Sequence, residues 1–543
     1  MGRVFVIGVA MTKFDKPGTK AGDYPDWGKE AILAALQDAN VKMNEIQLAT
    51  AGFAYGESTC GQRVIYEVGM TGIPIFNVNN NCSTGSTALM LAKEMVECGK
   101  AECALAVGFE KMQKGSLGSV FNDRVHPMEK HIEVMSELVD ISATPIVAQM
   151  FANAGLEHMK KYGTKPEHLV KIAWKNHKHS VNNPNSQFRD EYTLEQIEKS
   201  PRVCGPLTKL QCCPTSDGAA AVIVASESFV KSHRLESKAV EILGMEMATD
   251  LPSTFNERSL LKLVGYDMTK LAADRLYKKT GKRASDVQVV ELHDCFSANE
   301  LITYEALNLC PPGGAGALVD RGDNTYGGKY VVNPSGGLIS KGHPIGATGL
   351  AQCAELSWQL RGEAGPRQVP NAKLALQHNI GLGGAVVVAL YQLGFPQSKN
   401  SNTRARKTAA AASEDGFIVT PFLHILQEAM LEDQDGLVEK HRAIYGLKVQ
   451  NDKGEEGFWI INTKKGKGKI EFNGKDKPAV TFVIKDADII DLLTGKIEPQ
   501  RAFFQGKVKI QGNMGLALKL TELQRSAASK IDALRAKHLK SKL

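Results

Sequence analysis

The stretch NNNCSTG, residues 79–85, decides how the fold of this chain is interpreted. It follows the apolar, strand-like run PIFNV and leads into a helical pattern over residues 86–98. A polar turn and a second strand-like run, residues 103–107, complete the unit. Strand, loop, helix and strand in this order are typical of a βαβ unit. The order places the loop, with Cys82 in it, at the carboxyl end of a strand and at the start of a helix.

The same order of elements recurs in the second half of the chain. The run VVNPSGG, residues 331–337, leads to the loop GHPIGATG, residues 342–349, a helical pattern over 350–360 and a strand-like run over 373–376. Few side chains are identical between the two segments, so the matched order is the evidence for a duplication. The sequence therefore predicts an α/β fold of two similar halves, with layered helices and sheets and a reactive loop at the start of a helix in each half.

The chain is too long for one hydrophobic core. Single cores stop growing at about 250–300 residues, and this chain has 543. We expect a first domain over residues 1–395, including a loop region around 115–205, and an exposed linker over the polar, basic segment 396–415. In residues 416–543 an amphipathic helix around 420–430 precedes short alternating runs, which predicts a small α+β domain with a strand meander.

Composition and charge argue against several classes of protein. The net charge of +7 is small for this length and does not indicate a nucleic-acid binder. The ten cysteines include no metal-type Cys-x-x-Cys pair, so we expect free thiols, a reducing compartment and no metal site. The longest apolar runs are far shorter than the roughly 20 residues of a membrane span. We therefore expect no transmembrane segment.

The last three residues, Ser541, Lys542 and Leu543, match the address that the peroxisomal import receptor reads. The alternative is a chance match. Together with the chemistry described below, the tripeptide predicts a peroxisomal protein.

Cys82 is the first candidate catalytic residue. Its sulfur is expected to face the positive end of the helix dipole, which favours a thiolate nucleophile. Gly85 permits close approach of a ligand, and backbone N–H groups at a helix start can hold an oxyanion. The alternative is a buried structural cysteine.

Three further loops carry reactive side chains. His343 lies in a glycine-rich turn that exposes its ring, although a lone loop histidine is more often an ordinary surface residue. The loop HDCF, residues 293–296, follows the strand-like run VQVVEL, and a helix cap at Asp294 or Ser297 is the alternative interpretation. The loop HNIGLGG, residues 378–384, could line an oxyanion site or form a tight turn into the next strand.

Together the loops CSTG, HDCF, GHPIGATG and HNIGLGG resemble the thiolase superfamily, in particular its sterol carrier protein x branch. The resemblance covers residues 1–395. The residues after the linker, including GNMGLALKL, resemble the sterol carrier protein 2 domain. The resemblance implies a duplicated thiolase fold and a peroxisomal enzyme of beta-oxidation that cleaves 3-oxoacyl-CoA thiolytically, 2-methyl-branched and sterol side-chain substrates included.

The resemblance also implies roles for individual residues. Cys82 would be the nucleophile, His343 would activate it, and His293 would orient a water in the oxyanion hole. Common thiolases carry Asn-Glu-Ala-Phe in place of HDCF and a second cysteine in place of His378-Asn379, so Cys295 would supply the general acid and base. The backbone of Gly381 would complete the oxyanion hole. The role of His378 is left open.

The implied ligands and partners follow from the same resemblance. Coenzyme A would be a cosubstrate with no bound cofactor, and the thiolase domain would form a homodimer. The carboxy-terminal domain would bind a sterol, phospholipid or fatty acyl ligand, with Trp459, Phe482 and Met514 as candidate lining residues. Two alternatives are a non-catalytic CoA-binding lipid-transfer protein and a condensing synthase of the same fold.

Overall fold

The computed structural model describes residues 2–115 and 123–395, and in the carboxy-terminal part residues 417, 419–432, 442–451, 456–464, 466–486, 488–489 and 508–512. The chain forms two compact units, Met1–Pro396 and Gln397–Leu543, which are described separately. The predicted linker, Met514 and the terminal Ser541, Lys542 and Leu543 lie outside the described residues.

The first unit contains the predicted duplication. The strand order in the first half is β3-β2-β4-β7-β1, and in the second half it is β10-β9-β11-β12-β8. In both halves the first two pairings are parallel and the last two antiparallel, and a short pairing of β1 with β8 joins the halves. The first-half elements are β1 (Val4–Met11), α1 (Tyr24–Ala39), β2 (Leu48–Gly52), α2 (Cys60–Tyr66), β3 (Ile75–Val78), α3 (Thr84–Glu97), β4 (Cys103–Glu110) and β7 (Gly218–Ser226). Those of the second half are β8 (Val240–Ala248), α11 (Tyr266–Thr280), β9 (Val289–Glu291), β10 (Val331–Val332), α15 (Thr348–Arg361), β11 (Ala375–Gly381) and β12 (Ala385–Leu393).

Helices and half-sheets alternate as layers. α3 and α15 pack against each other in the middle, and apolar side chains from both half-sheets contact them. α1 covers the other face of the first half-sheet, and α11 covers that of the second. The two loops predicted to be reactive both precede the central helices, so this packing brings them together.

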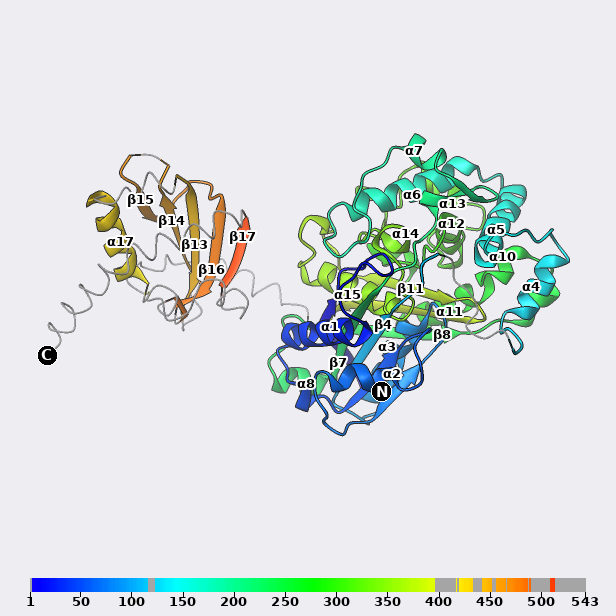
Figure 1. Cartoon of the computed structure of the whole chain (residues 1–543), viewed down its shortest axis with the longest axis horizontal. Coiled ribbons are helices and arrows are strands. Elements are labelled where there is room, and N and C mark those ends of the chain that lie inside the picture. The colour runs from blue at the N-terminus through cyan, green and yellow to red at the C-terminus, as the bar shows by residue number, and fades with distance from the viewer. Residues whose placement is uncertain are drawn as a thin grey trace. The chain divides into compact units, whose positions relative to one another are not determined.

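Insertions in both halves surround these loops. Between β4 and β7 the chain forms α4 (Glu129–Ser136), α5 (Ile146–Tyr162), α6 (Pro166–Ser180), α7 (Leu194–Glu198), β5 (Arg202–Cys204) and β6 (Leu207–Thr208). The second half adds α12 (Ser297–Ala306), α13 (Ala315–Asp320) and α14 (Gly337–Lys341), and α8 (Glu227–Ser232), α9 (Pro252–Asn256) and α10 (Leu260–Leu263) are short connectors. In Figure 1 the inserted helices α4 to α7 gather on one side of the first unit, together with α12 and α13.

Glycines let the loop GHPIGATG of the second half pack directly against the backbone of the first half. A Cβ atom on Gly346 would lie 2.5 Å from the backbone oxygens of Gly52 and Phe109, and one on Gly85 would lie 2.8 Å from the oxygen of Gly346. A Cβ on Gly108 would overlap the same oxygen of Gly346. Real Cβ atoms do not approach backbone this closely, so the halves can dock only with glycine here.

Gly108→Ala should therefore destabilise the first unit by about 3 kcal/mol, because the new methyl group meets rigid backbone. The control is Gly69→Ala, where the nearest atom to the new Cβ is a Met43 side-chain carbon at 3.4 Å. Denaturant unfolding followed by circular dichroism measures both. Equal midpoints for the two variants would show that the close approach is not required.

Two details differ from the sequence prediction. HNIG is not a turn: β11 runs through Gly381, and the turn begins at Leu382. The carboxy-terminal strands are not a simple meander, because β16 returns to pair in parallel with β13, in the sheet order β15-β14-β13-β16-β17. This unit contains α17 (Thr420–Glu432), β13 (Ile444–Gln450), β14 (Glu456–Asn462), β15 (Lys469–Phe472), β16 (Val480–Lys485) and β17 (Val508–Gly512).

The α/β and α+β classes are both confirmed. Among the described residues no helix is long and apolar enough to cross a membrane.

Candidate active site

Cys82 lies directly before α3, on a loop that its own residues hold in place. The backbone N–H of Asn80 donates to the Thr84 hydroxyl at 2.9 Å, and Asn80 forms an isolated bridge with Cys82. Cys82 lines a cavity of the unit. Burial, and after it the Glu110 carboxylate, raise the pKa of Cys82 to about 12. This direction favours a thiol over the predicted thiolate in the free protein, and a base would then have to take the Cys82 proton.

His343 has one ring nitrogen free to accept a proton. Its Nδ1 lies 2.7 Å from the Thr348 hydroxyl, which itself donates to the carbonyl of Pro344 at 3.0 Å. Thr348 therefore accepts from Nδ1–H, and the lone pair is on Nε2. This Nε2 is buried and has no hydrogen-bond partner among the described residues. Burial, and after it the charge of Lys341, lower the pKa of His343 to about 3, so the ring is neutral.

His293 has the opposite tautomer. The Ser86 hydroxyl accepts from Gln377 Nε2 and donates to Asn379 Oδ1, each at 2.9 Å. The amide nitrogen of Asn379 therefore donates to His293 Nδ1 at 3.0 Å, which leaves the hydrogen on Nε2. Burial, and then the neighbouring His343 and His378, lower the pKa of His293 well below its usual value. His293 is a neutral N–H donor.

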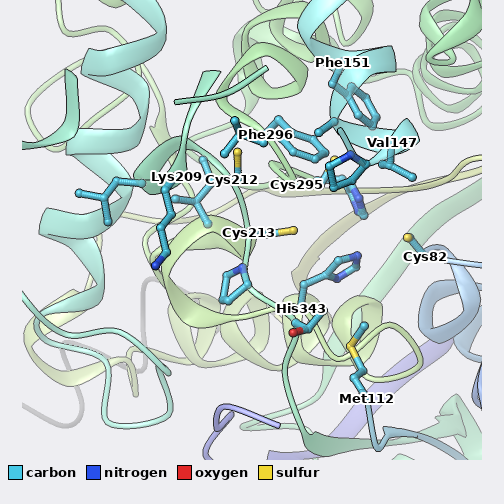
Figure 2. Close-up of a pocket in the computed structure, with 18 of the residues that line it drawn as sticks. Cys82, Met112, Val147, Phe151, Lys209, Cys212, Cys213, Cys295, Phe296 and His343 are labelled. Atoms are coloured by element: carbon cyan, nitrogen blue, oxygen red, sulfur yellow. The ribbon is translucent and has the colours of Figure 1, made fainter. Parts of the chain in front are cut away.

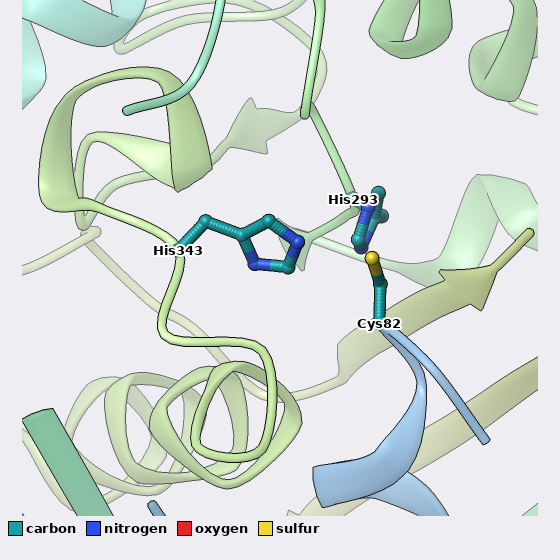
Figure 3. A group of neighbouring side chains, drawn as sticks. All are labelled: Cys82, His293 and His343. Atoms are coloured by element: carbon teal, nitrogen blue, oxygen red, sulfur yellow. The ribbon is translucent and has the colours of Figure 1, made fainter. Parts of the chain in front are cut away.

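The three side chains converge on one point, as Figure 3 shows. The Cys82 sulfur and one ring nitrogen of each histidine lie within 4.8 Å of one another, and the rings of His293 and His343 meet edge to face at 5.0 Å. The spacing would suit a zinc ion. We assign no metal ligands here, because the free nitrogen of His293 already carries a hydrogen. The site holds a thiol, a lone pair and an N–H donor.

A cavity of about 490 Å³ opens beside this group and is lined mainly by apolar side chains (Figure 2). Cys295 lines it, and so does Cys213, which the sequence reasoning did not single out. Burial raises the pKa of both thiols well above the usual value; the next cause is Cys82 for the Cys213 thiol and Cys213 for the Cys295 thiol. Both are therefore protonated at neutral pH and could act as acids.

Asp294 and His378 support the loops and do not line the cavity. The Asp294 carboxylate accepts the backbone N–H groups of Leu338 at 2.6 Å and Ile339 at 3.2 Å, so it caps α14 and not the helix that follows it. His378 Nδ1 accepts the backbone N–H of His293 at 3.4 Å. His378 therefore holds the His293 loop.

Gly381 packs directly on the Cys82 loop. A Cβ atom there would overlap the carbonyl oxygen of Asn80 and would lie 3.1 Å from the nitrogen of Ser83. Only glycine lets the end of β11 come this close, which fits the backbone role predicted for it.

The sequence analysis did not single out the residues that hydrogen-bond the two histidines, Thr348 and Asn379, or Glu110, which raises the pKa of Cys82. Thr348 lies five residues after His343, and Asn379 was quoted only as part of a motif. Thr348 could have been noticed as a hydroxyl shortly after a loop histidine. Glu110 could have been noticed as a carboxylate at the carboxyl end of an apolar strand.

In the carboxy-terminal unit, Trp459 and Phe482 are buried in the core. Trp459 meets Phe417 edge to face at 5.2 Å. Their part in lipid binding stays a prediction.

Comparison with known proteins identifies the families to which the two units are similar. The thiolase N-terminal domain model matches residues 4–228, the thiolase C-terminal domain-like model residues 256–390 and the SCP-2 sterol transfer family model residues 422–525. Sterol carrier protein 2 of Oryctolagus cuniculus is 59% identical over 527 residues, which is 96% of each chain, and that of Homo sapiens is 57% identical over the same shares. The chain belongs to the sterol carrier protein 2 family. It is a thiolase-type acyltransferase joined to a sterol carrier domain.

Other relatives cover the first unit alone. Non-specific lipid-transfer protein-like 2 of Caenorhabditis elegans is 55% identical over 404 residues, 74% of this sterol carrier protein 2 family member and 98% of the relative. Among solved structures, the Ltp2-ChsH2(DUF35) aldolase has a TM-score of 0.61 and human mitochondrial 3-ketoacyl-CoA thiolase one of 0.54, each 21% identical over 72% of this chain and 98% of that chain. These structures share the fold, and because one is an aldolase the fold alone does not fix the reaction.

The tautomer of His293 can be tested with Asn379→Asp. A carboxylate would accept from Nδ1–H and move the hydrogen away from Nε2, so the donor is lost and activity should fall about 10²-fold. Nitrogen NMR of the histidines should report the changed tautomer. The control is Asn324→Asp, a buried amide that donates to Tyr304 outside the site at 3.0 Å. Full activity of Asn379→Asp would contradict the assignment.

Proposed function

We propose that the first unit cleaves 3-oxoacyl-CoA by thiolysis, with Cys82 as nucleophile. The observation that supports this best is the opposite tautomers of two histidines beside one thiol. His343 Nε2 takes the Cys82 proton as the sulfur attacks the 3-oxo carbon, and the thiolate and imidazolium stabilise each other. The backbone N–H groups of Cys82 and Gly381 hold the tetrahedral oxyanion.

Carbon–carbon cleavage follows from the same residues. When the adduct collapses, the C2–C3 bond breaks and its electron pair forms the enolate of a CoA thioester. His343, now protonated, and a water held by His293 donate to the enolate oxygen, and Cys295 protonates C2. The Cys295 thiolate then takes the proton of free CoA, whose sulfur attacks the acyl carbon and displaces Cys82 as a thiolate. His343 returns its proton to that thiolate, which restores the starting state.

We further propose that 2-methyl-branched and sterol side-chain substrates are accepted, giving propanoyl-CoA where acetyl-CoA would otherwise leave. The volume and apolar lining of the cavity support an acyl chain larger than acetoacetyl. CoA binds as a cosubstrate. The carboxy-terminal unit carries a sterol, phospholipid or fatty acyl chain in the pathway of beta-oxidation.

Three of the four cysteines that line the cavity, Cys82, Cys213 and Cys295, give the direct test. Cys82→Ala should abolish cleavage of straight-chain and 2-methyl-branched 3-oxoacyl-CoA, and Cys295→Ala should lower it by about 10²- to 10⁴-fold, the usual value for a lost acid and base. Cys213→Ala is the matched control and should stay within about threefold of wild type.

Each contrary result has a meaning. Loss of activity in Cys213→Ala with Cys295→Ala unaffected would move the acid and base to Cys213. Wild-type protein that cleaves no substrate but transfers lipid would favour a non-catalytic CoA binder. Condensation without cleavage in the presence of CoA would favour a synthase.

Peroxisomal import through the receptor for Ser541-Lys542-Leu543 is part of the proposal, supported by the tripeptide itself. Deletion of these three residues should leave the protein in the cytosol of transfected cells.

We also propose that the first unit forms a homodimer, with one edge of its sheet as the interface. β3 is an edge strand, and Phe76 on it is 41% exposed, with Met70 and Tyr66 exposed nearby in sequence. An uncovered edge with apolar side chains is a pairing surface.

Phe76→Lys should convert the dimer to a monomer, because a charge would be buried at the interface. Light scattering coupled to gel filtration measures the mass. The control is Leu194→Lys, which changes an equally exposed leucine on α7. A monomeric wild type, or a dimeric Phe76→Lys, would contradict this interface.

A further inference from the structure

Glu110, the last residue of β4, is a buried carboxylate that connects the two halves of the first unit. It is 1% exposed. Its oxygens accept the backbone N–H groups of Ala54 at 3.0 Å and Tyr55 at 2.9 Å, which follow β2 in the first half. They also accept the N–H of Gly346 at 3.0 Å, in the loop of the second half. One side chain therefore fastens three segments.

The bond to Gly346 acts on the catalytic base. Gly346 lies three residues after His343 and two before Thr348, which orients the His343 ring. A carboxylate accepting three N–H groups is strongly held, and its bonds are charge-assisted. Loss of the Gly346 bond would free the loop that sets the distance between His343 Nε2 and the Cys82 sulfur.

The charge of Glu110 also raises the pKa of the nucleophile. Within residues 2–115 and 123–395 no cation forms an ion pair with Glu110. Burial raises its pKa to about 7, although the three N–H bonds act to lower it. After burial, its charge is the main cause that raises the pKa of Cys82. The other titratable groups facing Cys82 or Glu110 are Tyr55, Cys213, Asp217, His293, Cys295 and His343.

We propose that Glu110 is a positioning residue: its carboxylate holds the His343 loop against the half that carries Cys82. The turnover part of this inference rests on the proposed thiolase function.

Two variants separate the hydrogen bonds from the charge. Glu110→Gln keeps the length but removes the charge and one accepting oxygen, whereas Glu110→Asp keeps the charge but is too short to reach all three N–H groups. Both should lower kcat about 10²-fold with KM within about threefold, because a base misplaced by about 1 Å loses that much rate. Activity is expressed per folded first unit, measured by calorimetry.

The second readout is alkylation of Cys82 by iodoacetamide, followed by peptide mass spectrometry over a range of pH. Only the thiolate reacts. At pH 9 the carboxylate of wild type opposes the thiolate, so Glu110→Gln should react about tenfold faster, as expected for a thiol pKa lowered by about one. Glu110→Asp should follow the wild-type profile.

Asp217→Asn is the matched control. Asp217 is another 1% exposed carboxylate that accepts backbone N–H groups, from Met112 at 2.8 Å and Gly18 at 2.9 Å, but it does not bond the His343 loop. It should change kcat less than threefold.

Wild-type kcat in both Glu110 variants would overturn the proposal. So would losses that only match a loss of folded protein. An alkylation profile of Glu110→Gln identical to that of wild type would contradict the effect of the Glu110 charge on Cys82. If Glu110→Gln does not fold, Glu110→Asp still decides the positioning role. A wild type that cleaves no substrate would refute the proposed function, while the alkylation comparison would still test Glu110.

Discussion

The active site depends on the close approach of the loop around Gly346 to the backbone of the first half. Neither half holds a complete set of reactive groups: Cys82 belongs to one, and His293, Cys295 and His343 belong to the other. Helices α3 and α15 bring the halves together, but glycine at the contact lets the loops meet at backbone distance. The duplicated fold therefore works as two halves that are each incomplete without the other.

Hydrogen bonding gives the two histidines of the site different tasks although burial makes both neutral. Thr348 accepts from one ring and Asn379 donates to the other, so one presents a lone pair and the other an N–H group. The side chains that bond the two rings therefore determine whether each ring can accept or donate a proton. The raised pKa of Cys82 fits the proposed role of His343 as base, because a stable thiolate would leave that base without a proton to take.

Much of this could be predicted from the sequence, because strand, loop and helix order recurs and the motifs around Cys82, His293 and His343 stand at element ends. The extension of β11 through His378 was missed, since a glycine-rich segment gives no strand signal until β12 pairs with it. Cys213 and Glu110 were missed because their importance comes from contacts between segments far apart in the chain. The protonation of Cys82 depends on burial, which no local pattern encodes.

The central claim is that Cys82 becomes acylated. The most direct measurement mixes the protein with a 3-oxoacyl-CoA in the absence of free CoA, quenches in acid and maps the peptides by mass spectrometry. The account predicts a thioester carrying the shortened acyl chain on Cys82, removed when CoA is added before the quench. No adduct, or an adduct on Cys213 or Cys295 instead, would contradict it.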